Sequence, residues 1–99
     1  MNYFFCTGNA CNDAERVERP GGRTEAKFRL AVDRDFRNAE GERETDYYTV
    51  IATRYVDVTY ALERIHRGAR LAVTGTLSRR ETETGHESVI FASKLEVQP

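Results

Sequence analysis

Only one segment of this 99-residue chain has the spacing of an amphipathic helix, and that segment is short. Within residues 58–67, Val58, Leu62 and Ile65 lie at positions i, i+4 and i+7, so they share one face of a helix. Asp57 directly precedes the segment and is the predicted N-cap. A single helix of this length cannot cover a large sheet. The sequence therefore excludes folds in which layers of helices pack on a sheet.

The rest of the regular pattern is typical of β-strands, in which alternate residues point to opposite faces. Phe28 and Leu30 alternate with Lys27 and Arg29, which indicates one buried and one solvated face. Gly75 lies inside a similar alternation and predicts a bulge or a sharp bend. The predicted strands are residues 3–8, 26–32, 45–54, 71–77 and 89–97.

Charged and turn-forming segments separate these strands. Residues 9–25 contain the turn signal Pro20-Gly21-Gly22, and residues 33–44 and 79–87 are predicted charged loops. In the last strand, the apolar residues share one parity, which puts them on one face; they are Val89, Phe91, Leu95 and Val97.

The order strand, strand, strand, helix, strand, strand predicts an all-β chain whose sheet closes into a barrel, with the helix plugging one end. A five-stranded barrel with one short helix between strands 3 and 4 is the OB-fold. We expect a single domain over residues 1–99. In this fold, the face of strands 2 and 3 and the loops 1–2 and 4–5 bind oligonucleotides or oligosaccharides. The fold alone does not fix the ligand.

Composition narrows the functional classes. The 15 basic and 16 acidic residues give a net charge of −1, which argues against binding duplex DNA by bulk charge. Cys6 and Cys11 form neither a disulfide framework nor a zinc site, so a reducing, cytoplasmic compartment is expected. No catalytic constellation, metal site or cofactor motif is present, and no segment has the pattern of a secretion signal or a membrane span.

The remaining signal is aromatic residues interleaved with arginines, of which the chain has 13 among its 15 basic residues. Phe36 lies between Arg34 and Arg37, and Tyr47 and Tyr48 must point to opposite faces of their strand. Exposed aromatic rings flanked by arginines form stacking platforms, on which single-stranded nucleic acid is held without reading of sequence.

The order of several short motifs resembles the bacterial single-stranded DNA-binding proteins. The segments that carry the resemblance are Gly8-Asn9, Asp13, Pro20-Gly21-Gly22, Phe28-x-Leu30-Ala31, Thr45-Asp46-Tyr47 and Gly68 through Leu77. They cover about residues 2–97. The resemblance implies an OB-fold that binds single-stranded DNA, and the residues expected to bind it are Arg34, Phe36, Arg37, Tyr47, Arg54, Tyr55, Arg79 and Arg80.

Phe36 and Tyr47 stand where that family places base-stacking tryptophans, and Tyr55 stands near its phenylalanine at the end of strand 3. This chain has no Trp, and Thr82 or a neighbouring acidic residue aligns with the stacking Trp of the 4–5 loop. The given sequence ends at Pro99, directly after the last predicted strand, so it resembles a minimal form without the family's acidic tail. Whether this end is natural stays open.

Consecutive aromatics at Tyr3, Phe4 and Phe5 are too many for one barrel interior, so we expect a homo-oligomer. The resemblance implies a tetramer ahead of a dimer, because in that family the first strand helps build a dimer and dimers pair into tetramers. The leading functional hypothesis is a non-enzymatic, cytoplasmic, nucleoid-associated protein. It would bind single-stranded DNA without sequence preference in replication, recombination or repair. The alternative is a primosome-type OB-fold adaptor that acts through protein contacts. An RNA or oligosaccharide binder and a small nuclease are further alternatives.

Overall fold

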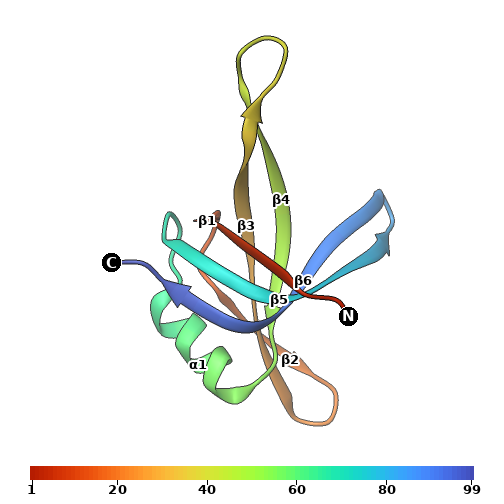
Figure 1. Ribbon diagram of the computed structural model, residues 1–99. Helices are drawn as coiled ribbons and strands as arrows, with labels where there is room; N and C mark the ends of the chain where they lie inside the picture. The colour runs from red at the N-terminus through yellow and green to blue at the C-terminus, as the bar shows by residue number, and fades with distance from the viewer.

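The computed structural model describes residues 1–99 and contains one sheet that closes into a barrel (Figure 1). Its elements are β1 (Phe4–Ala10), β2 (Glu15–Arg19), β3 (Arg23–Arg37), β4 (Arg43–Ala52), α1 (Tyr55–Arg64), β5 (Arg70–Thr82) and β6 (Gly85–Val97). The order of strands is β1-β5-β6-β4-β3, and β3 pairs again with β1, which closes the ring. β4 and β6 run parallel, and all other pairs are antiparallel. The predicted five-stranded barrel is confirmed, and β2 extends the sheet beside β3.

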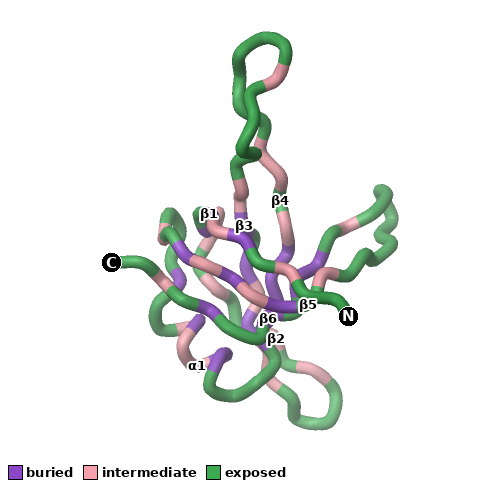
Figure 2. Tube along the Cα trace, viewed as in Figure 1, coloured by how far each residue is buried: buried purple, intermediate pink, exposed green.

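The barrel interior is filled by alternate residues of the strands. The fully buried large side chains of this core include Phe28, Leu30, Val50, Leu71, Val73 and Ile90. α1 adds Val58, Ala61 and Ile65 to the same cluster, so the helix plugs one end of the barrel, as predicted. Figure 2 shows these buried positions concentrated where the strands cross, while the hairpin ends are exposed.

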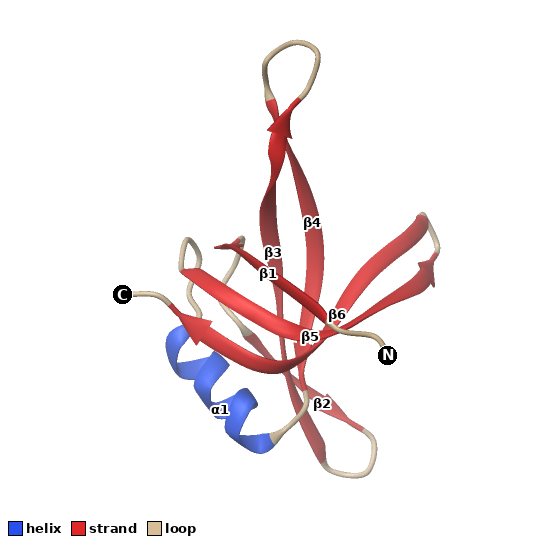
Figure 3. Cartoon of the chain, viewed as in Figure 1, coloured by secondary structure: helices blue, strands red, loops and turns tan.

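The helix begins earlier than the sequence predicts. α1 starts at Tyr55 with Arg54 at the N-cap position, and no side chain caps it. The prediction that Asp57 is the N-cap is wrong. Asp57 lies in the first helical turn, where its carboxylate interacts favourably with the positive end of the helix dipole. It also accepts a 2.7 Å hydrogen bond from Arg54 Nε. As the only helix in Figure 3, α1 is too short and too polar to cross a membrane.

Two predicted loops are long arms of paired strands. Residues 33–44 continue β3 and begin β4, and residues 79–87 continue β5 and begin β6. Both arms project from the barrel and are exposed (Figures 1 and 2). Both faces of these strand segments are exposed to solvent, so polar and charged residues occupy both. They therefore lack the apolar alternation by which a half-buried strand is recognised.

The last strand changes face along its length. The register of β5 and β6 passes from Thr74↔Lys94 to Gly75↔Ala92, so Ser93 is an extra residue in β6. This bulge confirms the irregularity predicted at Gly75. It also makes the predicted common face wrong, because Leu95 is buried in the core whereas Phe91, on the far side of the bulge, is 42% exposed on the outside of the barrel.

The two cysteine thiols differ in their environment, and this gives a first prediction. Cys6 is in the core, where burial raises the pKa of its thiol to about 11, whereas Cys11 is partly exposed. The thiolate is the reactive form of cysteine. With a pKa of about 11, only about one Cys6 thiol in a thousand is ionised at pH 8. We expect a thiol reagent at pH 8 to modify one site per native chain, Cys11, and the second only after unfolding. Mass spectrometry counts the labels.

The variant Cys11→Ser is the matched control and should leave no rapidly modified thiol in the native protein. Rapid modification of two thiols in the native wild-type chain would contradict the buried position of Cys6.

Candidate nucleic-acid interface

On the outer surface of the barrel, side chains of neighbouring strands form rows that run across the sheet. In one cross-strand row, Lys27 of β3 lies beside Ile51 of β4, and Ile51 lies beside Phe91 of β6. In the next row, Arg29 lies beside Thr49. These residues alternate with the core residues of the same strands, so they point away from the barrel interior. The outer face therefore combines two cations with an exposed aromatic ring.

Tyr47 stands on the same outer face, further along β4. Its ring is 52% exposed and lies under the Arg29 guanidinium, at 5.4 Å from the guanidinium carbon to the ring centre. The adjacent Tyr48 points to the opposite face and packs against Phe4, with ring centroids 5.4 Å apart. This confirms the prediction that the two neighbouring tyrosines point to opposite faces of their strand, with at least one on the solvent side. The Arg29 contact restricts the Tyr47 ring, and the exposed half of this residue is available for stacking.

Three hollows follow one another along this outer face, and we call them together the outer groove. The first, about 410 Å³, lies between the two arms and is lined by Arg29, Tyr47, Thr82, Thr84, His86, Glu87 and Ser88. The second, about 260 Å³, shares Arg29 and Glu87 with the first and adds Asn12, Glu15, Lys27, Phe28 and Thr49. The third, about 570 Å³, lies where the β2–β3 hairpin meets the start of α1.

The third hollow contains Tyr55, which is 86% exposed, together with Arg16 and Arg23. Thr53, the residue directly after β4, lines this hollow, and Glu25 of β3 has the same parity as Lys27 and Arg29. An extended chain advances roughly 20 Å from Tyr47 to Thr53, at about 3.3 Å per residue. An aromatic ring therefore stands near each end of the groove, with cations along its length.

Three carboxylates line the groove: Glu87 in the first and second hollows, Glu15 in the second and Glu25 in the third. Glu87 lines both the first and the second hollow, accepts a hydrogen bond from the buried Thr49 hydroxyl, and forms an ion pair of 2.9 Å with Arg80. The Thr49 hydrogen bond and then the Arg80 bond lower the pKa of Glu87, so its carboxylate is ionised at neutral pH.

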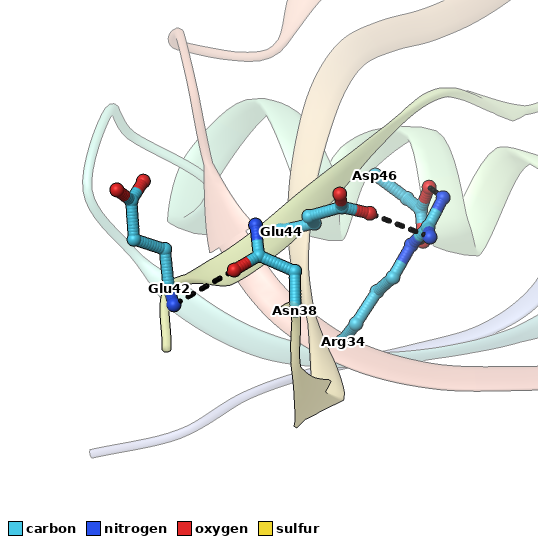
Figure 4. Close-up of polar contacts among 5 residues, drawn as sticks. All are labelled: Arg34, Asn38, Glu42, Glu44 and Asp46. Carbon is cyan, nitrogen blue, oxygen red and sulfur yellow. Dashed lines mark hydrogen bonds and ion pairs between the residues drawn. The ribbon is translucent and has the colours of Figure 1, made fainter. Parts of the chain in front are cut away.

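Phe36 and Arg34 do not join Tyr47 in the groove. Both line a separate hollow, of about 510 Å³, beside β1 with Phe4 and Phe5. Arg34 donates to Asp46 at 3.0 and 3.1 Å and to Glu44 at 2.7 Å (Figure 4).

Two acidic side chains of β4, Glu44 and Asp46, are therefore paired with Arg34. The Arg34 guanidinium holds the pKa of the Asp46 carboxyl below its usual range. At the turn, the Asn38 side-chain oxygen accepts a hydrogen bond from the backbone N–H group of Glu42 (Figure 4) and another from that of Glu40.

The other predicted arginines have different surroundings. Arg37 donates to the carbonyl of Gly41 at 2.9 Å, and Arg54 is held by Asp57 and by the carbonyl of Ser93. Arg79 and Arg80 are adjacent on β5, so they point to opposite faces of their arm, and Arg80 is the one beside the groove.

Of the eight predicted residues, the structure brings Tyr47, Tyr55 and Arg80 to the outer groove. Sequence reasoning missed Lys27 and Arg29, whose alternation with Phe28 and Leu30 was a sign of an outer face. Sequence reasoning also missed Glu87, which lines the groove and lay in a predicted loop, and Phe91, which the bulge places on the same outer face of the sheet.

Comparison with known proteins connects this geometry to a family. The pattern of the Single-strand binding protein family matches residues 1–98. The chain belongs to this family. Among curated members, it is 28% identical over 95 residues to the single-stranded DNA-binding protein of Streptococcus mutans serotype c, covering 96% of this chain and 57% of that protein. It is 30% identical over 95 residues to single-stranded DNA-binding protein 3 of Streptococcus agalactiae serotype V, covering 96% of this chain and 68% of that protein.

Solved structures share the fold of this family member. A small single-stranded DNA-binding protein from Streptomyces coelicolor superposes with a TM-score of 0.78 at 24% identity, covering 99% of this chain and 95% of that one. The Plasmodium falciparum SSB in complex with ssDNA superposes with a TM-score of 0.84 at 20% identity, covering 100% and 96%. Both confirm the OB-fold.

Proposed function

We propose that this chain is a non-enzymatic protein that binds single-stranded DNA without sequence preference along the outer groove. The observation that carries the proposal is the exposed Tyr47 ring held by Arg29 in a hollow between two arms. Bases stack on Tyr47, Phe91 and Tyr55, while Lys27 and Arg29 contact phosphates. Membership of the family, whose curated relatives are named single-stranded DNA-binding proteins, supports the same ligand.

The chemistry of the groove favours a single strand over a duplex. Stacking needs bases whose faces are free, and a paired duplex does not offer them. The net charge of −1 gives little bulk attraction for a duplex, so binding depends on the local cations and rings. Because every base has a stacking face, such a groove tolerates any sequence.

The proposed setting is DNA replication, recombination or repair in the cytoplasm, as a homo-oligomer. Self-association is supported by Tyr3 and Phe5, which are large, apolar and exposed at the start of β1. The free barrel leaves them in water, and a second copy that covers them removes this apolar surface from solvent. Measurement of the subunit mass in solution tests this part.

A fluorescence titration with oligo-dT at several salt concentrations tests the function. With Lys27 and Arg29 contacting two phosphates, we expect a slope of log K against log salt of about −1.4, from about −0.7 per phosphate. A duplex of equal length should bind more weakly and serves as the control. Absence of binding to oligo-dT at low salt would contradict the proposal and leave the OB-fold adaptor as the better hypothesis.

A further inference from the structure

We infer that Glu87 is an internal competitor of the DNA phosphates, which weakens the hold of the outer groove and speeds release of the strand. The inference rests on the proposed function. Its basis is the position of Glu87, which is the one carboxylate shared by two hollows of the groove and lies there beside Arg29, where a binding surface for a polyanion would favour cations.

The geometry places Glu87 centrally. It lines two of the three hollows, with Arg29 in both, Tyr47 in one and Lys27 in the other. Its side chain is 21% exposed, so an incoming phosphate can reach its surroundings. A strand that crosses from Tyr47 toward Lys27 therefore passes this carboxylate.

The carboxylate cannot readily move away. Thr49, which is buried, donates its hydroxyl hydrogen bond to Glu87 Oε1, while Arg80 Nη2 donates to Oε2 at 2.9 Å. Both oxygens are thus held from within the protein. Because the two oxygens are anchored by different strands, β4 and β5, the negative charge stays in the groove when DNA arrives.

The consequence is competition between two anions for Arg80. The Arg80 side chain is 45% exposed and available to a phosphate, but its guanidinium is already paired with Glu87. A phosphate that binds Arg80 must share the guanidinium with the carboxylate, so the net gain is smaller than for a free arginine. The same carboxylate repels phosphates held by Arg29 and Lys27.

The test is the variant Glu87→Gln, which keeps an oxygen to accept from Thr49 and removes the charge. We expect oligo-dT to bind about three- to tenfold more tightly at about 50 mM salt, with a slower dissociation rate. The slope of log K against log salt should steepen by about 0.7, since Arg80 gains a phosphate. If Glu87 had only a structural role, Glu87→Gln would leave the slope of log K against log salt unchanged.

Two further variants sharpen the result. Glu96→Gln removes one charge from the same strand but outside the groove, and it should leave the slope unchanged. Glu87→Asp keeps the charge and should return the slope to the wild-type value. Thermal melting shows whether each variant is folded.

The inference is overturned if the wild-type chain binds oligo-dT and folded Glu87→Gln binds it with equal or lower affinity, because Glu87 would then only position Arg80. If Glu87→Gln does not fold, failure of Glu87→Asp to keep the wild-type slope would overturn it. If the wild-type chain itself does not bind oligo-dT, the proposed function fails instead.

Discussion

Replacing Tyr47 by alanine is expected to lower the affinity for oligo-dT by about 5- to 150-fold, because one base–aromatic stack is worth about 1–3 kcal/mol. The effect should lie near the upper end of this range. Arg29 holds the ring from one side, so little side-chain freedom is lost when a base stacks on the other. Fluorescence anisotropy of a labelled oligo-dT measures the change.

The matched control is Phe36→Ala. Phe36 is 84% exposed and is more accessible than Tyr47, but it lines the hollow beside β1. We expect its loss to change affinity by less than about threefold in the single barrel. Tyr47→Phe keeps the ring and should retain most of the binding. Equal losses for Phe36→Ala and Tyr47→Ala would show that the DNA path includes the other face of the β3–β4 arm.

Gly75→Ala is expected to destabilise the protein by about 3 kcal/mol or more, at the upper end of the range for forced overpacking. A Cβ atom on residue 75 would lie 2.2 Å from the carbonyl oxygen of Phe91 and 2.9 Å from its carbon. Both atoms belong to the backbone of the paired strand, so no side-chain rotation relieves the clash. In a domain of this size, the melting temperature should fall by roughly 12–24 °C.

Gly41→Asn provides the comparison for Gly75. Gly41 has a φ of +79°, and its Cβ direction is open, with nothing within 4 Å. Asn tolerates this left-handed conformation better than other residues with a side chain, so the expected loss is below about 1 kcal/mol. Thermal melting by circular dichroism measures both variants, and a wild-type melting temperature for Gly75→Ala would contradict the close approach of β5 and β6.

The barrel was predictable because its core strands alternate cleanly and because the helix was too short for any layered fold. Phe28 and Leu30 show why, since each is buried and each has a cation beside it in the sequence. The arms were not predictable by the same reasoning. A strand with water on both faces has no apolar period, so the segments around Asp35 and Glu81 have the composition of loops.

The site was only partly predictable, because neighbours in sequence can face different sides of a sheet. Phe36 and Arg34 appeared to belong with Tyr47, yet an irregular register in β3 between Asp33 and Arg37 and the pairing of Arg34 with Asp46 place them apart. Lys27 and Arg29 had the pattern of an ordinary solvated face. Only the register of the strands shows that this face meets Tyr47.

The backbone pairing of the two arms has a consequence for the entropy of binding. Flexible loops would have to order around a ligand and lose conformational freedom as they did so. Here the walls beside Tyr47 are ladders, with β3 paired to β4 and β5 paired to β6 as far as Thr82↔Gly85. The groove is thus pre-formed, so the conformational freedom lost in the complex falls on the DNA strand rather than on the protein.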